Sequence, residues 1–561
     1  MTEYGAGPKS EEGFSTKQIA SEDFRKAVQN IENQVDALPK TLPIVRRPKN
    51  LAIWALLTQG YLHLTGRAQP FEMGTPQQSV YTANMSRIVA TAINWVWTYA
   101  PAVWISNQQL QTDNDLMRDA QDAVEVSGEF AAFTATMPAW HKGRLLAELI
   151  DEVCVRFIPD NFDTVERRVR AYQHGIRPKG KHKAPRDDLA MEPHLKEQID
   201  RKFEGIMSQF GAARLAYSKP TNLWRLLHQG YLELLKKTFR RGAQLVLGDF
   251  TLGQFCQVHA AILAICGTHE GLLQRWTQQR GNPPLNDVLL IYQKNEWVRH
   301  ISRLAQTDFV TTDAIISDLT FGATRVQSLF VHPFVPLDRD QAVLGVLPLF
   351  PMSSNADENI LRVCSELRRD KYDLLTELKE GEMNDEIVAG CSSFHCRCRC
   401  SLPVPLPDVD LLIEDITNKT VLIAELKYLR HALSVSENLN REKDFRKAVT
   451  QLYSIRKFLT ANPDYLYKNG YMSRRLDEVN RVQYAVIARD YFVWLDPKVE
   501  FPVIADEPFR EMLGKTTDLG VGLDLLLTFD WLPVEGEDFD IKWHRATVNG
   551  VSVEHVLVQP L

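Results

Sequence analysis

Hydrophobic and polar positions follow three different patterns along the chain. Over residues 51–335 the apolar residues recur mostly three and four positions apart, which predicts an all-helical region. Over 356–500 a charged helical pattern alternates with short apolar runs, which predicts a mixed α/β domain. Over 501–561 apolar and polar residues alternate, and an Asn-Gly pair at 549–550 predicts a β-hairpin. We therefore expect a small β-rich C-terminal addition after the α/β domain.

Two further segments divide the chain. Residues 1–50 are mostly polar, with one short amphipathic run around 24–31, so we expect a loosely attached extension. Residues 331–355 are rich in proline and break the helical period, which indicates a domain boundary. Because 561 residues are too many for a single core, the chain is expected to be multidomain.

A near-repeat lies inside the predicted helical region. The segment 54–64 (WALLTQGYLHL) and the segment 224–234 (WRLLHQGYLEL) match at most positions. Their separation is too long for the unit of a solenoid. We expect a duplicated helical element whose Trp, Leu and Tyr residues pack the core; the alternative is that the two Gln-Gly-Tyr segments form paired binding surfaces.

Composition restricts the class of protein only loosely. A net charge of −6 predicts no nucleic-acid partner by itself, so such binding requires local basic patches. The apolar stretch 88–105 is interrupted by Asn94 and Pro101, and we expect a buried core helix without membrane contact. The first residues lack the pattern of a secretory signal, and eight unevenly spaced cysteines do not form a disulfide framework. An intracellular, cytoplasmic location is expected.

Charged residues stand at the outer ends of an otherwise apolar pair of predicted strands, 407–427. Asp408 and Asp410 open the first strand, and Glu425 and Lys427 close the second. Ionisable groups at the rim of a sheet covered on both sides repel or pair at a cost unless they bind something. Two carboxylates beside a backbone carbonyl suit a hard cation such as Mg²⁺ or Mn²⁺. Such a cation acidifies bound water and offsets charge on a phosphate, and a nearby lysine stabilises the pentavalent phosphate.

The register of this hairpin decides whether the charges meet. A turn at 417–418 places Asp410 opposite Glu425, and a turn at 418–419 places Asp410 opposite Lys427. Both registers put the three charges on one face, and the asparagine of the turn is expected to adopt the positive φ that a tight turn needs. The alternative is that the hairpin has no catalytic role and ends in an ordinary salt bridge between Asp410 and Lys427.

With Asp410 on the first strand and Glu425-Leu426-Lys427 on the next, the chain resembles the PD-(D/E)XK nuclease superfamily. The resemblance covers about 140 of the 561 residues and implies a restriction-endonuclease-like αβββαβ core. The expected elements are a helix at 358–380, a strand at 394–402, the hairpin, a helix at 440–459 and a strand at 482–488.

The resemblance also implies roles for individual residues. Asp410, Glu425 and the Leu426 carbonyl would bind the metal, and Lys427 would orient the attacking water. On the following helix Gln451 would assist, although the tyrosine that some branches carry four residues later is replaced by Ile455. A further acid is expected from one of four residues, Asp408, Glu377, Glu380 and Glu382.

Two basic clusters are candidates for contacting nucleic acid. One cluster lies on the helix after the hairpin and contains Lys443, Arg446 and Lys447. The other lies in a Gly-, Pro- and Lys-rich part of 166–186 and contains Arg177, Lys179, Lys181 and Lys183. Each has a plain structural alternative, a charged helix face or a solvated loop. The run 391–400 (CSSFHCRCRC) lacks zinc-ligand spacing, and its cysteines are expected to be small buried residues of a strand, with redox sensitivity as the alternative.

The sequence thus predicts a Mg²⁺- or Mn²⁺-dependent endonuclease that hydrolyses DNA. The helical region would select substrate, bind a partner protein or keep the site inactive, and cutting both strands would favour a homodimer. Defence against foreign DNA, antiviral defence included, or DNA repair follows by analogy with the superfamily. The alternatives are an RNA-cleaving enzyme and a non-catalytic interaction protein that keeps a nuclease-like scaffold.

Overall fold

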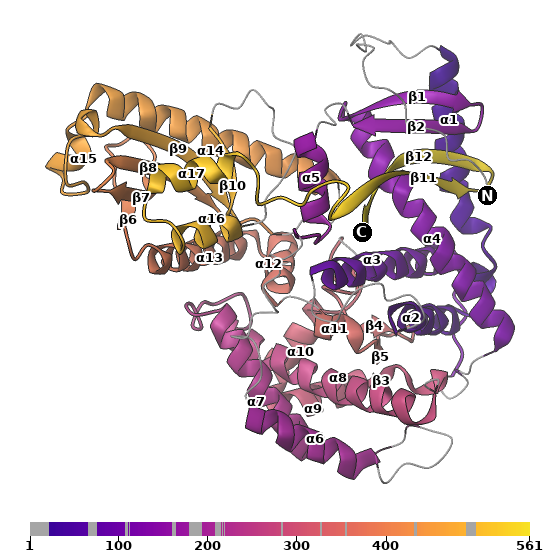
Figure 1. Ribbon diagram of the computed structural model, residues 1–561. Helices are drawn as coiled ribbons and strands as arrows, with labels where there is room; N and C mark the ends of the chain where they lie inside the picture. The colour runs from indigo at the N-terminus through magenta and orange to yellow at the C-terminus, as the bar shows by residue number, and fades with distance from the viewer. Residues whose placement is uncertain are drawn as a thin grey trace.

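A computed structural model describes residues 22–561 except 66–75, 107–109, 111–112, 160–163, 179–192, 208–214, 216, 218, 282–283, 326–327, 354–355, 431–434 and 490–500. Figure 1 shows a sheet-containing body at the left, coloured orange to yellow. The rest of the molecule consists mainly of helices coloured indigo to salmon, together with short strands and the yellow C-terminal hairpin, and α12 (Ala356–Leu367) lies where the two parts meet.

The N-terminal region is helical, as its apolar spacing predicts. Its helices are α1 (Glu22–Ala37), α2 (Lys49–Thr65), α3 (Pro76–Tyr99), α4 (Asn114–His141), α5 (Thr164–Gln173), α6 (Pro193–Met207), α7 (Thr221–Thr238), α8 (Leu252–Arg280), α9 (Lys294–Ala305), α10 (Phe309–Asp318), α11 (Leu349–Ser353) and α12 (Ala356–Leu367). The expectation of an all-helical region is nevertheless incomplete. Among the described residues of 51–335, short strands interrupt the helices: β1 (Leu145–Asp151), β2 (Cys154–Pro159) and β3 (Leu290–Gln293). β4 (Val335–Pro336) and β5 (Val343–Val346) lie in the predicted boundary 331–355.

Helix α1 corrects the expectation of a loose polar extension. Phe24, Val28, Ile31 and Val35 recur at helical spacing and are all buried. They pack in one cluster with residues of α4, β2 and the C-terminal hairpin. The amphipathic run around 24–31 is therefore part of the folded core.

The C-terminal hairpin forms as predicted but does not stand apart. β11 (Phe539–Val548) and β12 (Val551–Pro560) pair antiparallel, and Asn549 and Gly550 have φ values of 49° and 81°, as a tight hairpin turn requires. β12 also pairs with β2, which gives a four-stranded sheet of order β1-β2-β12-β11. The end of the chain thus completes a sheet of the N-terminal region, as Figure 1 shows.

A five-stranded sheet forms the centre of the α/β part. It consists of β6 (His395–Cys400), β7 (Val409–Asp415), β8 (Thr420–Lys427), β9 (Arg481–Ala488) and β10 (Val503–Ala505), in the order β10-β9-β8-β7-β6. The first three strands are antiparallel, whereas β9 and β10 continue the sheet in parallel. Because β10 belongs to this sheet, the α/β part extends beyond the expected end at residue 500.

Helices cover both faces of this sheet. They are α13 (Arg369–Gly390), α14 (Val435–Ala461), α15 (Tyr465–Lys468), α16 (Asp506–Leu513) and α17 (Leu519–Leu527). Leu412 and Ile423 face the α14 side, and Leu411 and Leu422 face the side of α13 and α17. The predicted order of helix, three strands, helix and strand is present, but the single helix expected over 358–380 is two helices, α12 and α13.

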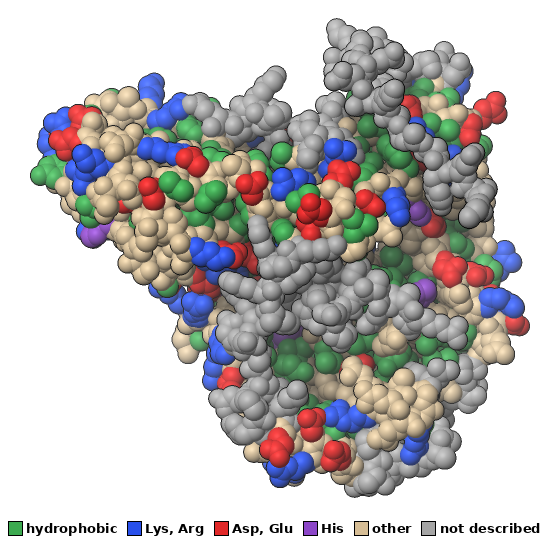
Figure 2. Space-filling view, in the orientation of Figure 1, with side chains coloured by type: hydrophobic (Ala, Val, Ile, Leu, Met, Phe, Trp, Pro, Cys, Tyr) green, Lys and Arg blue, Asp and Glu red, His purple; other side chains and the backbone are tan. Residues whose placement is uncertain are grey.

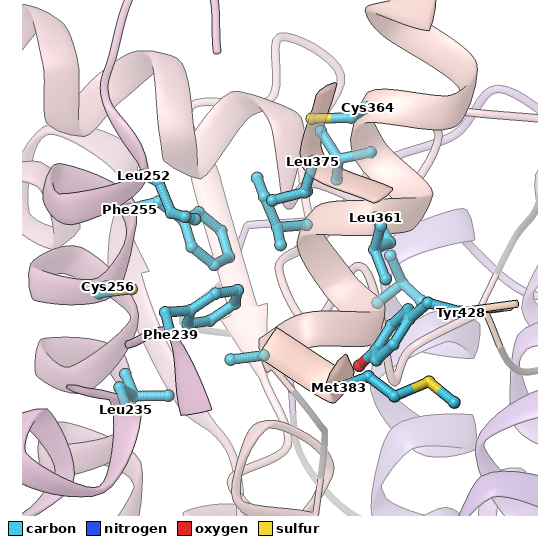
Figure 3. Packing of buried hydrophobic residues seen from close by; sticks show 14 of the residues in the cluster. Leu235, Phe239, Leu252, Phe255, Cys256, Leu361, Cys364, Leu375, Met383 and Tyr428 are labelled. Atoms are coloured by element: carbon cyan, nitrogen blue, oxygen red, sulfur yellow. The ribbon is translucent and has the colours of Figure 1, made fainter. Parts of the chain in front are cut away.

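The core of the α/β part continues into the helical region. Figure 3 shows Phe239 and Phe255, from the α7–α8 part of the chain, facing Leu361, Met383 and Tyr428 across one apolar cluster. The two parts therefore share buried surface.

The near-repeat occupies equivalent positions on α2 and α7. Trp54 and Trp224 are both buried, at 1% and 3% exposed. Tyr61 is buried as well, and Tyr231 packs against the core. These positions agree with the expected duplicated core element.

The apolar stretch 88–105 lies mostly in α3, which ends at Tyr99 before the proline. Ile93 and Val96 on this helix are fully buried, as expected for a core helix. In the described part of the chain, every helix is too short or too polar to cross a membrane.

Candidate active site

The β7–β8 hairpin adopts one of the two predicted registers. Leu411 pairs with Ala424, and the ladder runs to Asp415 opposite Thr420. Continued by one residue, this register sets Asp410 opposite Glu425. The positive φ falls on Lys419, at 53°, and not on the asparagine beside it. The reason is local: Asp415 accepts hydrogen bonds from the backbone and side chain of that asparagine and holds it in the turn.

Asp410 lies where the β7–β8 ladder ends. Its Oδ2 accepts a hydrogen bond from the backbone N–H of Leu426 at 2.9 Å. The Lys427 carbonyl accepts from Arg489 N, on the β9 side. Because successive peptide groups in a strand point to opposite neighbours, the Leu426 carbonyl points toward the β7 side, where Asp410 lies. The expected backbone ligand is thus directed toward the expected carboxylate.

Glu425 and Lys427 share the face of the sheet that α14 covers. Glu425 is only 3% exposed, and its Oε1 accepts from Lys427 Nζ at 2.9 Å. Its Oε2 is buried and has no hydrogen-bond partner among the described residues. The simple alternative of an Asp410–Lys427 bridge is wrong in detail, because the lysine pairs with Glu425.

Among the three candidate glutamates of α13, one joins these residues. Glu380 Oε1 accepts from the backbone N–H of Tyr428 at 3.3 Å, and its charge acts on the pKa of both Glu425 and Lys427. Glu377 is exposed and pairs with Arg399. Glu382 is buried and holds Lys379 at 2.7 Å.

The fourth candidate acid, Asp408, makes a loop contact. Its Oδ1 accepts from Leu402 N at 3.1 Å, although its charge still reaches Asp410.

The converging acids are held in an electrostatically unfavourable state. Burial, and then the charge of Asp410, raises the pKa of Glu425 to about 7. Burial also raises the pKa values of Asp410 and Glu380. Burial alone would lower the pKa of Lys427, but Glu425 and Glu380 outweigh it and the net pKa is raised. One lysine thus faces three buried or half-buried carboxyl groups, and an additional cation would relieve the excess of negative charge.

Helix α14 supplies an acid that the sequence argument missed. Burial raises the pKa of Asp444, while the nearby charges of Lys427 and Lys447 lower it. This places Asp444 beside the lysine of the site, on the helix that covers the same face. In the sequence, Asp444 is marked only as an acid among the basic residues of that helix. Gln451 lies about two turns further along α14, where its Oε1 is buried without a partner in the described structure.

The residues expected to contact nucleic acid differ in whether other side chains already hold them. Lys443 and Lys447 are exposed on α14. Arg446 is committed to Glu442, to which it donates at 2.6 Å. The remaining candidate that the structure describes, Arg177, stacks on Tyr172 with 3.7 Å to the ring centroid and donates to its carbonyl. Lys179, Lys181 and Lys183 lie outside the described residues.

Basic and acidic side chains are mixed over the surface. On the face seen in Figure 2 they alternate, in agreement with the small net charge. Near the site, the cation of Arg399 acts on Asp410, and that of Arg369 acts on Asp444. These two arginines and Lys447 surround the acidic centre from three elements, β6, α13 and α14.

The cysteines of β6 are less uniformly buried than expected. Cys400 is buried, Cys396 is half-buried and Cys398 is exposed. Cys398 donates to Asn384 Oδ1 at 3.1 Å, and Asn384 in turn donates to the backbone carbonyl of Asp410 at 3.3 Å. The strand therefore supports the backbone of the site through Asn384.

The donor set fits a divalent cation in its chemistry. It provides carboxylate oxygens, a directed carbonyl and the unpartnered Glu425 Oε2, which are the ligands that Mg²⁺ and Mn²⁺ prefer. No cluster of three His, Cys, Asp or Glu side chains in the described ranges is arranged to hold a metal ion. Ligation would therefore require Glu425 to turn from Lys427 toward Asp410.

Comparison with known proteins found no matching family model, no matching curated protein and no matching solved structure.

Proposed function

We propose that this protein is a metal-dependent phosphodiesterase that cuts nucleic acid, with a catalytic core of the PD-(D/E)XK type. One observation carries the proposal. Asp410, Glu425, Lys427 and Glu380 converge at the open end of the β7–β8 hairpin, and one buried oxygen of Glu425 has no partner among the described residues. The order of helices and strands around this hairpin supports the same assignment.

Asp410, Glu425 and the Leu426 carbonyl would hold a Mg²⁺ or Mn²⁺ ion, with Glu380 and Asp444 as neighbouring acids. When bound, the ion supplies an acidified water and neutralises charge on the phosphate. Asp410 stays oriented by the Leu426 N–H, which fixes one carboxylate oxygen. Once Glu425 turns toward the ion, Lys427 Nζ is free to donate to the attacking water or to a phosphate oxygen.

The pKa of Glu425 gives this proposal a pH dependence. A carboxyl group with a pKa of about 7 keeps its proton in acid solution and must lose it before it can bind a cation. Cation binding and cleavage are therefore expected to increase as the pH rises through about 7.

The exposed cations around the site favour a nucleic-acid substrate over a small phosphodiester. Lys443 and Lys447 can contact successive phosphates of a backbone, whereas Arg369 and Arg399 would first have to release Asp373 and Glu377. DNA is the proposed substrate and RNA the alternative, because a site of this kind recognises phosphate and not the sugar. Cutting both strands of a duplex would need two sites, from a homodimer or from successive nicks.

The test is cleavage of plasmid, linear duplex, single-stranded DNA and RNA with Mg²⁺, Mn²⁺ or chelator. Lys427→Ala and Glu425→Ala are compared with wild type, and Lys468→Ala, an exposed lysine on α15, is the matched control. We expect cleavage that requires metal, is lost in both site variants and persists in the control. Equal cleavage by all four proteins, or cleavage in chelator, contradicts the proposal. Well-folded wild type that cuts none of the substrates contradicts it as well.

A further inference from the structure

Tyr428, the residue directly after Lys427, connects the candidate site to a buried group of charges. Its backbone N–H donates to Glu380 Oε1 at 3.3 Å, inside the site. Its phenol O–H donates to Asp357 Oδ2, on α12, at 3.0 Å. Tyr428 and Asp357 are 8% and 7% exposed, so the contact between the phenol and Asp357 is shielded from water.

Lys379 lies at the centre of the same group and is only 4% exposed. Its Nζ donates to Glu382 Oε2 at 2.7 Å and to the Thr238 carbonyl at 2.7 Å, and it lies 3.1 Å from Asp357 Oδ2. An ammonium group has three donors, so these acceptors satisfy its full capacity. The three acceptors belong to three different helices: α13, α7 and α12.

The end of α7 is held at two points by α13. Thr238 is the last residue of α7, and the final carbonyls of a helix lack intrahelical donors and favour a nearby cation. Lys379 supplies both a donor to the Thr238 carbonyl and a positive charge at the end of α7. Three residues further along α13, Glu382 Oε1 accepts from Arg241 N, just beyond α7, at 2.9 Å.

The surroundings of this cation are otherwise apolar and aromatic. Nζ of Lys379 is 4.8 Å from the centroid of the Phe239 ring and 5.6 Å from that of Tyr428. Figure 3 shows Phe239 and Tyr428 on opposite sides of the shared cluster. A fully buried charge is costly and adds little net stability, even when it is paired. To keep all three acceptors of Lys379 within reach, α7, α12 and α13 must hold their relative positions.

We propose that Lys379 and Tyr428 are positioning residues that make the geometry of the candidate site depend on the C-terminal end of α7. The path runs from the Thr238 carbonyl to Lys379, Asp357 and Tyr428, and from the Tyr428 N–H to Glu380. The helical region then acts on the nuclease-like site through one buried cation. This inference rests on the proposed function and specifies how that site would be controlled.

The test uses the full chain with Tyr428→Phe and Lys379→Met. Tyr428→Phe removes the hydroxyl with its bond to Asp357 and keeps the ring, so it can be interpreted even if Lys379→Met fails to fold. Tyr484→Phe is the matched control, because Tyr484 is a buried tyrosine that lies opposite Ile423 of the measured segment and packs on Phe501 instead of Lys379 or Asp357. Metal-dependent cleavage gives kcat and KM, and hydrogen–deuterium exchange reports on the segment 420–430.

We expect kcat to fall about 10- to 100-fold in Tyr428→Phe, the range typical of residues that orient metal ligands, with KM for nucleic acid unchanged. Exchange in 420–430 should rise in both network variants and not in Tyr484→Phe. Wild-type kcat in a folded Tyr428→Phe variant overturns the inference.

If wild type itself cuts no nucleic acid, the proposed function fails. Hydrogen–deuterium exchange then tests by itself whether Lys379 and Tyr428 connect the end of α7 to the segment 420–430. Raised exchange in Tyr428→Phe then supports the link, and unchanged exchange refutes it.

Discussion

Replacing Glu425 by glutamine should stabilise the metal-free protein at alkaline pH. Glutamine keeps the shape of the side chain and an acceptor for Lys427 but carries no charge beside Asp410. The raised pKa means that folded Glu425 holds a proton that the unfolded chain has already lost. Wild-type stability therefore falls as pH rises from the ordinary value of 4.5 through about 7.

The size of the effect follows from the two pKa values. The difference between 4.5 and about 7 corresponds to about 3 kcal/mol at pH 8, and this is the expected advantage of Glu425→Gln in chelator. At pH 5 the advantage should shrink to less than about 1 kcal/mol, because folded Glu425 is then protonated. Excess Mg²⁺ should reverse the order: at about 1,000 times Kd it stabilises wild type by about 4.1 kcal/mol, which exceeds the advantage of the variant, and it leaves the variant unaffected.

Denaturant unfolding followed by circular dichroism measures these differences at pH 5 and pH 8, with chelator and with Mg²⁺. Glu511→Gln, an exposed acid on α16, is the control and should not gain the stability at pH 8 that is expected of Glu425→Gln. A Glu425→Gln protein that is less stable than wild type in chelator at pH 8 would refute the argument. It would show that the ion pair between Glu425 and Lys427 stabilises the folded protein.

Three further predictions concern other residues. Glu380→Gln should lower kcat about 10- to 100-fold in the plasmid assay, whereas Glu377→Gln, exposed on the same helix, should not; equal kcat values would contradict the placement of Glu380. Glu382→Ala should cost about 3–5 kcal/mol in denaturant unfolding because it leaves Lys379 buried beside one acid fewer, and a loss below about 1 kcal/mol would show that Lys379 does not need this partner. The double variant Lys443→Ala/Lys447→Ala should lower, by about 1.8, the steepness with which the logarithm of the DNA-binding constant falls with the logarithm of the salt concentration, while Arg177→Ala should leave it unchanged. Fluorescence anisotropy with duplex DNA at several salt concentrations measures this slope. An unaltered slope in the double variant would show that the DNA binds elsewhere.

Local patterns in the sequence are sufficient to predict the hairpin and the order of elements around it. Alternation along a strand determines which side chains share a face, so the sequence alone groups Asp410, Glu425 and Lys427. The turn chemistry allows two registers, and the hairpin adopts the first. The positive φ falls on a different turn residue from the one predicted, because Asp415, three positions before the asparagine, captures it.

The upstream acid cannot be chosen from the sequence because the rotation of α13 about its axis is a tertiary property. Glu377 and Glu380 are three positions apart and share one face of α13, whereas Glu382, two positions after Glu380, points to the other side. Only the packing of α13 against the sheet turns Glu380 toward Tyr428 and leaves Glu377 in solvent.

Long-range pairing explains the other differences. Arg156 of β2 binds Glu554 of β12, 398 residues away, and no local pattern predicts that the last strands return to the first part of the chain. The sequence predicts that Arg446 and Arg177 face nucleic acid, but Glu442 and Tyr172 engage them. A basic residue in sequence is available to phosphate only when the fold leaves it without an acidic or aromatic neighbour.

The most direct test of the account is calorimetric titration of Mn²⁺ into wild-type protein and into Glu425→Gln at pH 8. We expect binding to wild type that weakens toward pH 6, as Glu425 takes up its proton, and loss of that binding in the variant. Wild type that binds no Mn²⁺, or a variant that binds it as tightly as wild type, would contradict the claim that these acids form a metal site.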